Sequence, residues 1–472
     1  MPGVPSSRAC KACRAQKKLN IECIGAGQKR FKFVAQWSNQ EEESTSTSKQ
    51  VAKKRDTAPS ITLLLPSPAN ETTSFTSAWI DSIQVEKLGY RFGMLGPQIM
   101  LEIPKRLGHS DALDKAAHAV VSAFTYIRTG QQQREAYIKY GYALKALRLA
   151  LQDPKQGATS HTLCTIWMLM LCQNWIGRPE IKYGTHVAGM FHVMNTFAET
   201  INWHDYDEFD AQLIIASCYT MIMEQLSNPG VTIGPWLSKF GGPQGPRIYI
   251  PEEIQTIRIK KMEQINKSLL SPVPDRIGIE RAYHDVHSDI SILRRQIAEY
   301  CGNITPDTPF ETLPPRVVQI FFGLKIRYSL VLPYAIMIIY MFIALTPNEA
   351  EFKTLPEELA FCVEELLDLA KALTPFRPLG TESLPPSLSV AWATTDDVAK
   401  KAETQKWIVE YDSDFVGGNT MPVAIWCKKW ITGRREKWLA HYAGEVQDTE
   451  DCEVTDAELE ATLGPGRKCC IL

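Results

Sequence analysis

Three cysteines near the start of the chain have the residue type and spacing of a metal site. Cys10 and Cys13 are separated by two residues, a gap that lets two thiolates bind one metal ion, and Cys23 follows. Tetrahedral zinc takes four ligands, so three thiolates complete less than one tetrahedron. The sequence therefore predicts at most one zinc ion, bound by Cys10, Cys13 and Cys23.

The residues around these cysteines are strongly basic. Residues 1–37 hold eight lysines or arginines and one acidic residue. A short basic segment beside a metal site is suited to contact phosphates, or guanine edges in the major groove of DNA. We predict DNA contacts from the five cations nearest the first two cysteines: Arg8, Lys11, Arg14, Lys17 and Lys18.

The two segments 8–18 and 19–33 resemble the fungal binuclear zinc-cluster transcription factors. The first is similar to the family's first half-cluster, C-x-x-C-R-x-Q-K-K, and the second to the end of its second half. Short stretches at 67–73, 103–108, 112–116 and 186–189 are similar to the family's helical regulatory region. The resemblance implies a nuclear regulator of RNA polymerase II transcription, with DNA, zinc and the transcription machinery or co-regulators as partners.

The chain departs from this family in its number of ligands. The family has six cysteines in two C-x2-C-x6-C halves that share two zinc ions, and Asn20 stands where the third cysteine is expected. Compared with the family pattern, the resemblance implies that residues are missing between Lys18 and Leu19, through a gene-model error, an alternative transcript or a real loss. Because so small a domain folds only when it binds its metal, we expect the head to be mostly disordered and to bind DNA weakly, through charge.

The rest of the sequence divides by composition. The chain has 472 residues, of which 44% are hydrophobic, and a net charge of −2. Averaged over the whole chain, this charge does not indicate a nucleic-acid-binding surface. We expect a basic zinc-cluster module at 1–35, a Ser-, Glu- and Pro-rich disordered linker at 36–77, a regulatory domain at 78–443 and an acidic tail at 444–472.

The regulatory domain is expected to be all-α. Apolar residues recur at helical spacing, alternating strand patterns are scarce, and no repeat period is visible. Ser110 is a candidate N-cap and Gly130 a candidate C-cap for one helix. Further helices are predicted near 132–152, 159–175, 184–199, 207–227, 252–269, 280–302, 315–346, 355–373 and 422–443.

One stretch is apolar and long enough to be considered as a membrane span. Tyr328–Thr346 is uncharged and long enough to span a bilayer. Pro333 interrupts it, and a run of this kind within a large helical domain is typical of a buried core helix. We therefore predict a core helix and no membrane partner. The start of the chain shows no secretory signal, so we expect reduced cysteines.

Enzyme chemistry finds little support in the sequence. His284 and His287 share a helical face, but no third metal ligand accompanies them, so an exposed polar face is the better interpretation. Asp396 and Asp397 are followed by Lys400, without the second acidic segment that a magnesium-dependent cyclase needs. No nucleophile motif or glycine-rich phosphate loop is present. We predict that the chain is not an enzyme.

Two further features concern location. Lys53-Lys54-Arg55 and the basic head are candidates for a nuclear import signal. Cys469 stands fourth from the printed end, before Cys470, Ile471 and Leu472, which matches the C-a-a-X prenylation pattern. The alternative function is therefore an all-α scaffold, or a prenylated membrane-associated protein, without specific DNA binding.

Overall fold

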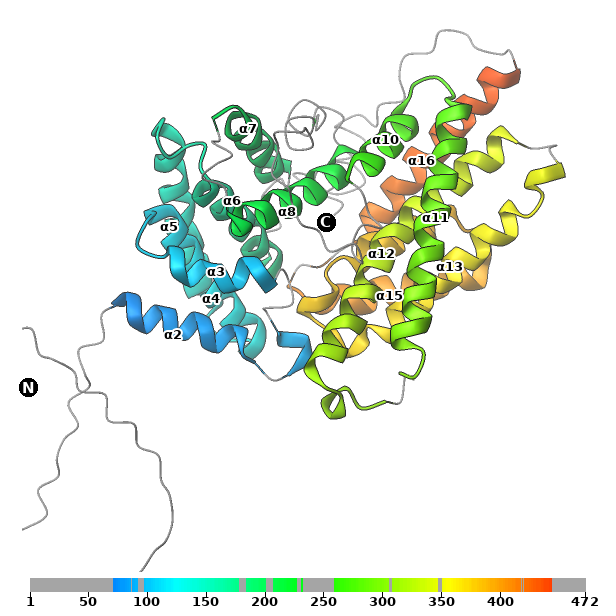
Figure 1. Cartoon of the computed structure of the whole chain (residues 1–472). Coiled ribbons are helices and arrows are strands. Elements are labelled where there is room, and N and C mark those ends of the chain that lie inside the picture. The colour runs from blue at the N-terminus through cyan, green and yellow to red at the C-terminus, as the bar shows by residue number, and fades with distance from the viewer. Residues whose placement is uncertain are drawn as a thin grey trace, which may run out of the picture. The chain divides into compact units, whose positions relative to one another are not determined.

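The computed structural model describes residues 71–85, 87–91, 97–177, 184–200, 207–226, 231, 259–304, 308–346, 350–416, 418 and 420–443. All regular elements within these ranges are helices (Figure 1), so the predicted all-α fold is confirmed. The described helices belong to one compact unit, Pro66–Leu472.

A first group of helices packs around α4 (Asp111–Thr129). The Ser110 side chain accepts a hydrogen bond from the Leu113 N–H, and Gly130 ends the helix with a φ of 68°, so both predicted caps are confirmed. Helices α2, α5 and α6 contact α4, α6 also contacts α7 and α8, and α3 contacts α8. Their bounds are α2 (Glu71–Ile83), α3 (Pro97–Arg106), α5 (Gln133–Gln152), α6 (Ser160–Ile176), α7 (Gly184–Thr200) and α8 (Glu208–Gln225).

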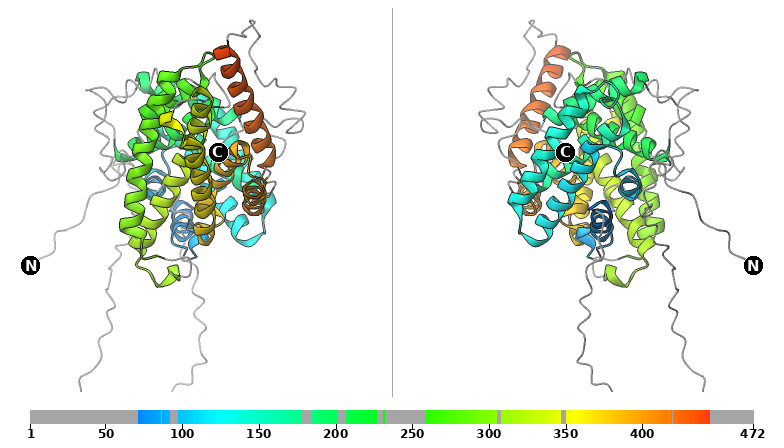
Figure 2. Two further views of the ribbon diagram at one scale, coloured as in Figure 1. Left: turned by 90° about the vertical axis from the view of Figure 1, so that its right-hand side faces the viewer. Right: turned by 90° about the vertical axis from the view of Figure 1, so that its left-hand side faces the viewer.

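A second group packs around α12 (Pro315–Leu345), which contacts α11, α13, α14 and α16. Figures 1 and 2 show this group from three sides. Helix α14 also contacts α15 and α16, and α10 connects α11 to α8 of the first group. The bounds are α10 (Ile259–Leu270), α11 (Arg276–Cys301), α13 (Leu355–Ala372), α14 (Leu384–Thr394), α15 (Val398–Asp412) and α16 (Met421–Ala443).

The uncharged stretch Tyr328–Thr346 forms the greater part of α12. By length and composition α12 passes the test for a membrane span, yet 83% of its most apolar window is buried inside the fold. Leu332, Ile336, Ile338, Met341 and Phe342 expose no surface. A helix that is apolar on every side is stable in water only when other helices cover it. The prediction of a buried core helix is confirmed.

The two groups share one hydrophobic core and meet at short 3-10 turns. One cluster of buried side chains extends from α2 to α16. Turn η1 (Leu88–Tyr90) contacts η6 (Thr374–Phe376) and η7 (Leu379–Thr381). The approach is close at Gly89, where a Cβ atom would overlap the carbonyl of Arg377. A residue without a side chain is therefore required at this contact.

Some helices differ from the sequence-based expectation. Helix α2 begins at Glu71, within the expected linker 36–77, because Phe75 and Trp79 bury their rings in the core. Helices α3, α14 and α15 were not predicted at all. Pro104 lies within α3, and α14 begins at Leu384 and carries two prolines in its first turn, where proline is tolerated. Helix α15 buries only a narrow stripe.

Candidate functional site

The predicted metal and DNA-binding residues lie outside the described residues. This holds for the thiols of Cys10, Cys13 and Cys23, for the candidate import signal 53–55 and for Cys469. It also holds for the five predicted DNA contacts Arg8, Lys11, Arg14, Lys17 and Lys18. Their roles, and the predicted zinc ion, remain predictions from the sequence.

The described cysteines are part of the core. Six thiols are buried: Cys164, Cys172, Cys218, Cys301, Cys362 and Cys427. Burial raises the pKa of Cys164, Cys362 and Cys427 to about 12, so each stays a neutral thiol at physiological pH. The reactive nucleophile is the thiolate, so these side chains are suited to packing. Within the described ranges, no three His, Cys, Asp or Glu side chains form a group that could hold a metal ion.

The histidine pair of α11 lies on an exposed face, as predicted. His287 Nε2 lies 3.8 Å from Glu358 Oε1 of α13, and the imidazole is half-exposed. The Tyr283 hydroxyl donates a 2.8 Å hydrogen bond to Glu358 Oε2, and its ring contacts the rings of His284 and His287. These contacts connect α11 to α13. They account for the position of the two histidines without a bound metal ion.

Asp397 has a structural role at the start of α15. Its Oδ1 accepts hydrogen bonds from the N–H groups of Ala399, at 2.8 Å, and Lys400, at 3.0 Å. Asp397 is therefore the N-cap of α15. A carboxylate at this position satisfies the unpaired donors of the first helical turn and interacts favourably with the helix dipole.

Several of the described methionines and tryptophans at helical spacing are buried in the core. Met168, Met190, Met194 and Met221 expose no surface, and Trp175 is fully buried. Methionines at helical spacing are typical of a core, but they can also line an adaptable ligand groove. In the structure these residues belong to the core.

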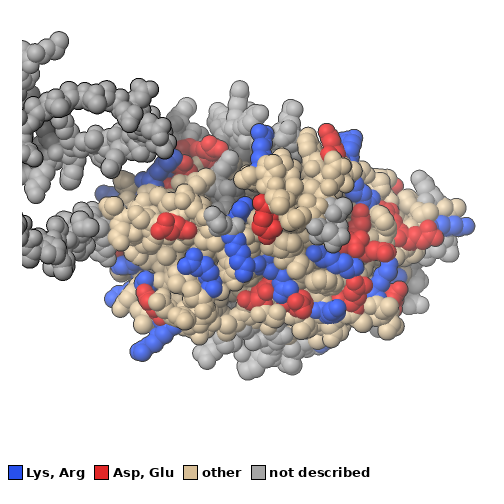
Figure 3. Space-filling model, turned by 90° about the horizontal axis from the view of Figure 1, so that it is seen from below, with Lys and Arg blue, Asp and Glu red and all other residues tan. Residues whose placement is uncertain are grey.

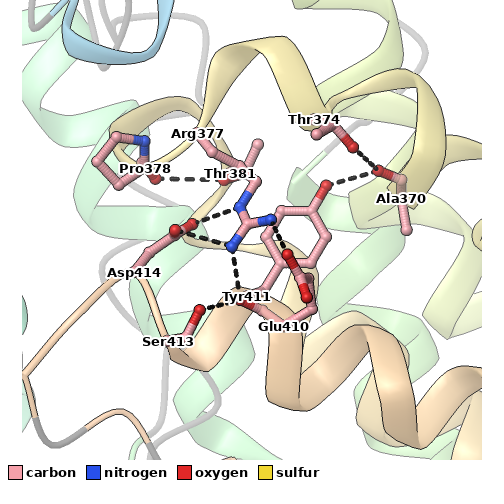
Figure 4. Close-up of polar contacts among 9 residues, drawn as sticks. All are labelled: Ala370, Thr374, Arg377, Pro378, Thr381, Glu410, Tyr411, Ser413 and Asp414. Atoms are coloured by element: carbon pink, nitrogen blue, oxygen red, sulfur yellow. Dashed lines mark hydrogen bonds and ion pairs between the residues drawn. The ribbon is translucent and has the colours of Figure 1, made fainter.

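The most elaborate polar site among the described residues lies where the two helix groups meet (Figure 4). Arg377, in the turn between η6 and η7, donates two 2.8 Å hydrogen bonds to Asp414 and one 2.8 Å bond to Glu410 Oε1. Its guanidinium also lies 4.8 Å from the ring centre of Tyr411. Arg377 and Asp414 each leave only 15% of the side chain exposed, which strengthens the pair. These contacts fix η6 and η7 against the end of α15.

Glu382 extends this site towards the first helix group. Its carboxyl group accepts a hydrogen bond from Trp175 Nε1, near the end of α6. Although the residue keeps some exposed surface, burial of the carboxyl group raises the pKa of Glu382 to about 7, and the hydrogen bonds from Trp175 and Asn174 offset part of that rise. Nearby, Gly177 has a φ of 65°, and a Cβ atom there would overlap the Val416 carbonyl.

This site, which we name the junction, consists of Trp175, Gly177, Arg377, Glu382 and Asp414. The raised pKa of Glu382 allows it to take up and release a proton near neutral pH, and its hydrogen bond from Trp175 connects the two helix groups. Within the described ranges no group of His, Cys, Asp or Glu side chains that could hold a metal ion accompanies it. Sequence analysis did not find these residues, because they are far apart in the chain and follow no motif.

The charged surface of the described domain is mixed on the face seen in Figure 3. Lysine and arginine side chains alternate there with aspartate and glutamate over most of the described surface. A uniform basic field, which attracts a polyanion over a distance, is not a feature of this face. The concentration of positive charge in this chain is at residues 1–37.

Comparisons with protein families, curated proteins and solved structures find no match to this chain.

Proposed function

We propose that the chain is a nuclear transcription regulator of the zinc-cluster type. The observation that carries the proposal is the basic head, with Cys10-x-x-Cys13 and Cys23, placed before a large helical domain. The all-α fold of that domain supports the proposal. Residues 8–18 contact DNA, and the helical domain serves as the regulatory part that receives co-regulators or the transcription machinery.

The donor set does not fit the two-zinc cluster of the family. Three thiolates supply fewer ligands than one tetrahedral zinc ion takes, and far fewer than two ions require. Specific recognition of DNA through a folded cluster is therefore not assigned to the chain as printed. Its DNA binding rests on Arg8, Lys11, Arg14, Lys17 and their neighbours, through phosphate contacts.

The experiment measures DNA binding by fluorescence anisotropy with the full chain. We expect equal affinity for CGG-containing and unrelated duplexes, and a steep loss of affinity between about 50 and 200 mM salt. The variant Arg14→Ala/Lys17→Ala/Lys18→Ala should bind more weakly and show a smaller salt slope. A matched control removes three exposed lysines of the helical domain, Lys353→Ala/Lys406→Ala/Lys429→Ala, and should bind as the wild type does.

Two results would overturn parts of the proposal. Zinc analysis that finds two ions per chain would show that the three cysteines are not the whole donor set. Equal DNA affinity of the head variant and the wild type would favour the alternative, an all-α scaffold without DNA binding through the head. Translation of the genomic DNA between the codons for Lys18 and Leu19 shows whether the natural protein carries the missing cysteines.

A further inference from the structure

Helix α5 presents an apolar stripe to solvent. Its inner face packs on α4 and α6 through buried residues such as Tyr140 and Ala143. On its outer face Ile138, Tyr142 and Leu149 lie at spacings of four and seven residues, which places them on one side of the helix. Their exposed fractions are 46%, 61% and 58%. The stripe extends for about 16 Å along the helix.

Three cations line the same side of α5. Arg134, Lys145 and Arg148 are exposed, and none of them forms an ion pair with another described residue. The remaining cation of the helix, Lys139, differs because its ammonium lies 2.8 Å from Glu135. A partner that covers the stripe therefore also meets three uncompensated positive charges, and binding is favourable only if the partner supplies anions.

The chain carries a segment with this chemistry. Residues 445–460 contain eight acidic residues and no lysine or arginine. Val454 and Leu459 supply apolar side chains within this stretch, and Leu463 follows it. A second copy of α5 is a poor partner because its cations would repel. Nucleic acid supplies anions but leaves an apolar stripe without an apolar partner. Of these three partners, the acidic segment alone matches both properties of the surface.

We propose that the outer face of α5 binds the acidic segment 445–463 of a second copy of this chain. Figure 1 shows α5 and the last turn of α16, after which this segment follows, at opposite sides of the domain. That placement favours the segment of a second copy over that of the same copy. Two copies bind reciprocally, each offering its segment to the α5 of the other, so the contact closes a dimer. The inference does not depend on DNA binding or zinc.

The test compares self-association of full-length chains by analytical ultracentrifugation. We expect the wild type to dimerise, with at least a tenfold loss of affinity when salt is raised from about 50 to 200 mM. The variant Arg134→Glu/Lys145→Glu/Arg148→Glu should dimerise at least tenfold more weakly. The matched control Lys353→Glu/Lys406→Glu/Lys429→Glu makes the same change in net charge at exposed positions outside α5 and should dimerise as the wild type does.

Reversing the charges on both surfaces tests whether α5 and the acidic segment bind each other. The variant Glu453→Lys/Glu458→Lys/Glu460→Lys should also dimerise weakly alone, and mixing it with the α5 variant should restore association, because reversed charges then meet. The variant Tyr142→Ser/Leu149→Ser tests the apolar stripe and should weaken the dimer at least tenfold. Circular dichroism verifies folding, which these exposed positions leave intact.

Several outcomes would overturn the proposal. The first is a wild-type chain that stays monomeric at every concentration even at low salt. The second is a control variant that dimerises as weakly as the α5 variant. The third is no recovery of association when the two charge-reversed variants are mixed. Association that disappears on nuclease treatment would assign the α5 face to nucleic acid instead.

Discussion

Replacing Glu382 with glutamine should stabilise the chain above neutral pH. In the folded chain burial raises the pKa of this carboxyl group from 4.5 to about 7. The unfolded chain releases the proton near pH 4.5, so between these two values the folded state binds more protons than the unfolded state. Stability therefore falls as pH rises from 4.5 to 7, and the full penalty applies above pH 7. Glutamine carries no charge and still accepts the hydrogen bond from Trp175 Nε1.

The size of the effect follows from the pKa difference. Each pH unit in this interval costs about 1.4 kcal/mol, so the interval from 4.5 to about 7 amounts to roughly 3 kcal/mol. The half-buried residues Asp210 and Asp412 also have raised pKa values and add to the slope of the wild type. Comparing Glu382→Gln with the wild type cancels their contributions.

The assay is urea unfolding followed by circular dichroism at pH 5, 6, 7 and 8. The wild type should lose up to about 3 kcal/mol more than Glu382→Gln over this series. Glu410→Gln is the matched control. The hydrogen bond that Arg377 donates lowers the pKa of Glu410, so this carboxylate is ionised in both the folded and the unfolded state from pH 6 to 8, and the substitution should not change the pH slope there. Parallel pH curves for the wild type and Glu382→Gln would refute the assignment of a buried, titrating carboxyl group.

Four further predictions concern stability and boundaries, each measured by urea unfolding or circular dichroism. Gly89→Ala should cost about 2 kcal/mol or more, because its Cβ would overlap the Arg377 carbonyl; an unchanged midpoint would contradict this contact. Trp79→Ala should cost about 3–5 kcal/mol, since the ring is fully buried. Ser110→Ala should cost about 1 kcal/mol through the lost N-cap, whereas Ser110→Thr should cost less. Deleting residues 1–70 should leave a soluble helical domain; a need for detergent would argue against a fully buried α12.

The helices that the sequence predicted share two properties. Helix α4 has a broad apolar face and a cap at each end, and α12 is too apolar and too long for a strand. Local signals are sufficient in such cases. Helix α14 was missed because Pro385 and Pro386 suggest a loop, although both fit the first helical turn. Helix α15 was missed because its packing depends on α14, which the sequence does not reveal.

The candidate site divides in the same way. The cysteines and cations of the head could be predicted because metal ligation follows a spacing that is visible in one dimension, and that prediction lies outside the described residues. The junction was not found, because Trp175 and Glu382 are brought together only by the packing of α6 against the turns before α14. Similarly, the sequence predicted the helix at 132–152 but not the exposed apolar stripe on its outer face. Only the exposed fractions of Tyr142 and Leu149 show that no described helix covers them.

The burial of α12 has a consequence for synthesis. The helix is complete at Leu345, but three of the four helices that cover it, α13, α14 and α16, follow later and end only at Ala443. Until about a hundred further residues have left the ribosome, a segment with the composition of a membrane span is exposed to water on most of its sides. Truncation between α12 and α16 should therefore yield aggregation or chaperone binding rather than a smaller folded protein. In this chain the last helix, α16, completes the cover of α12, and without that cover α12 exposes an apolar surface to water.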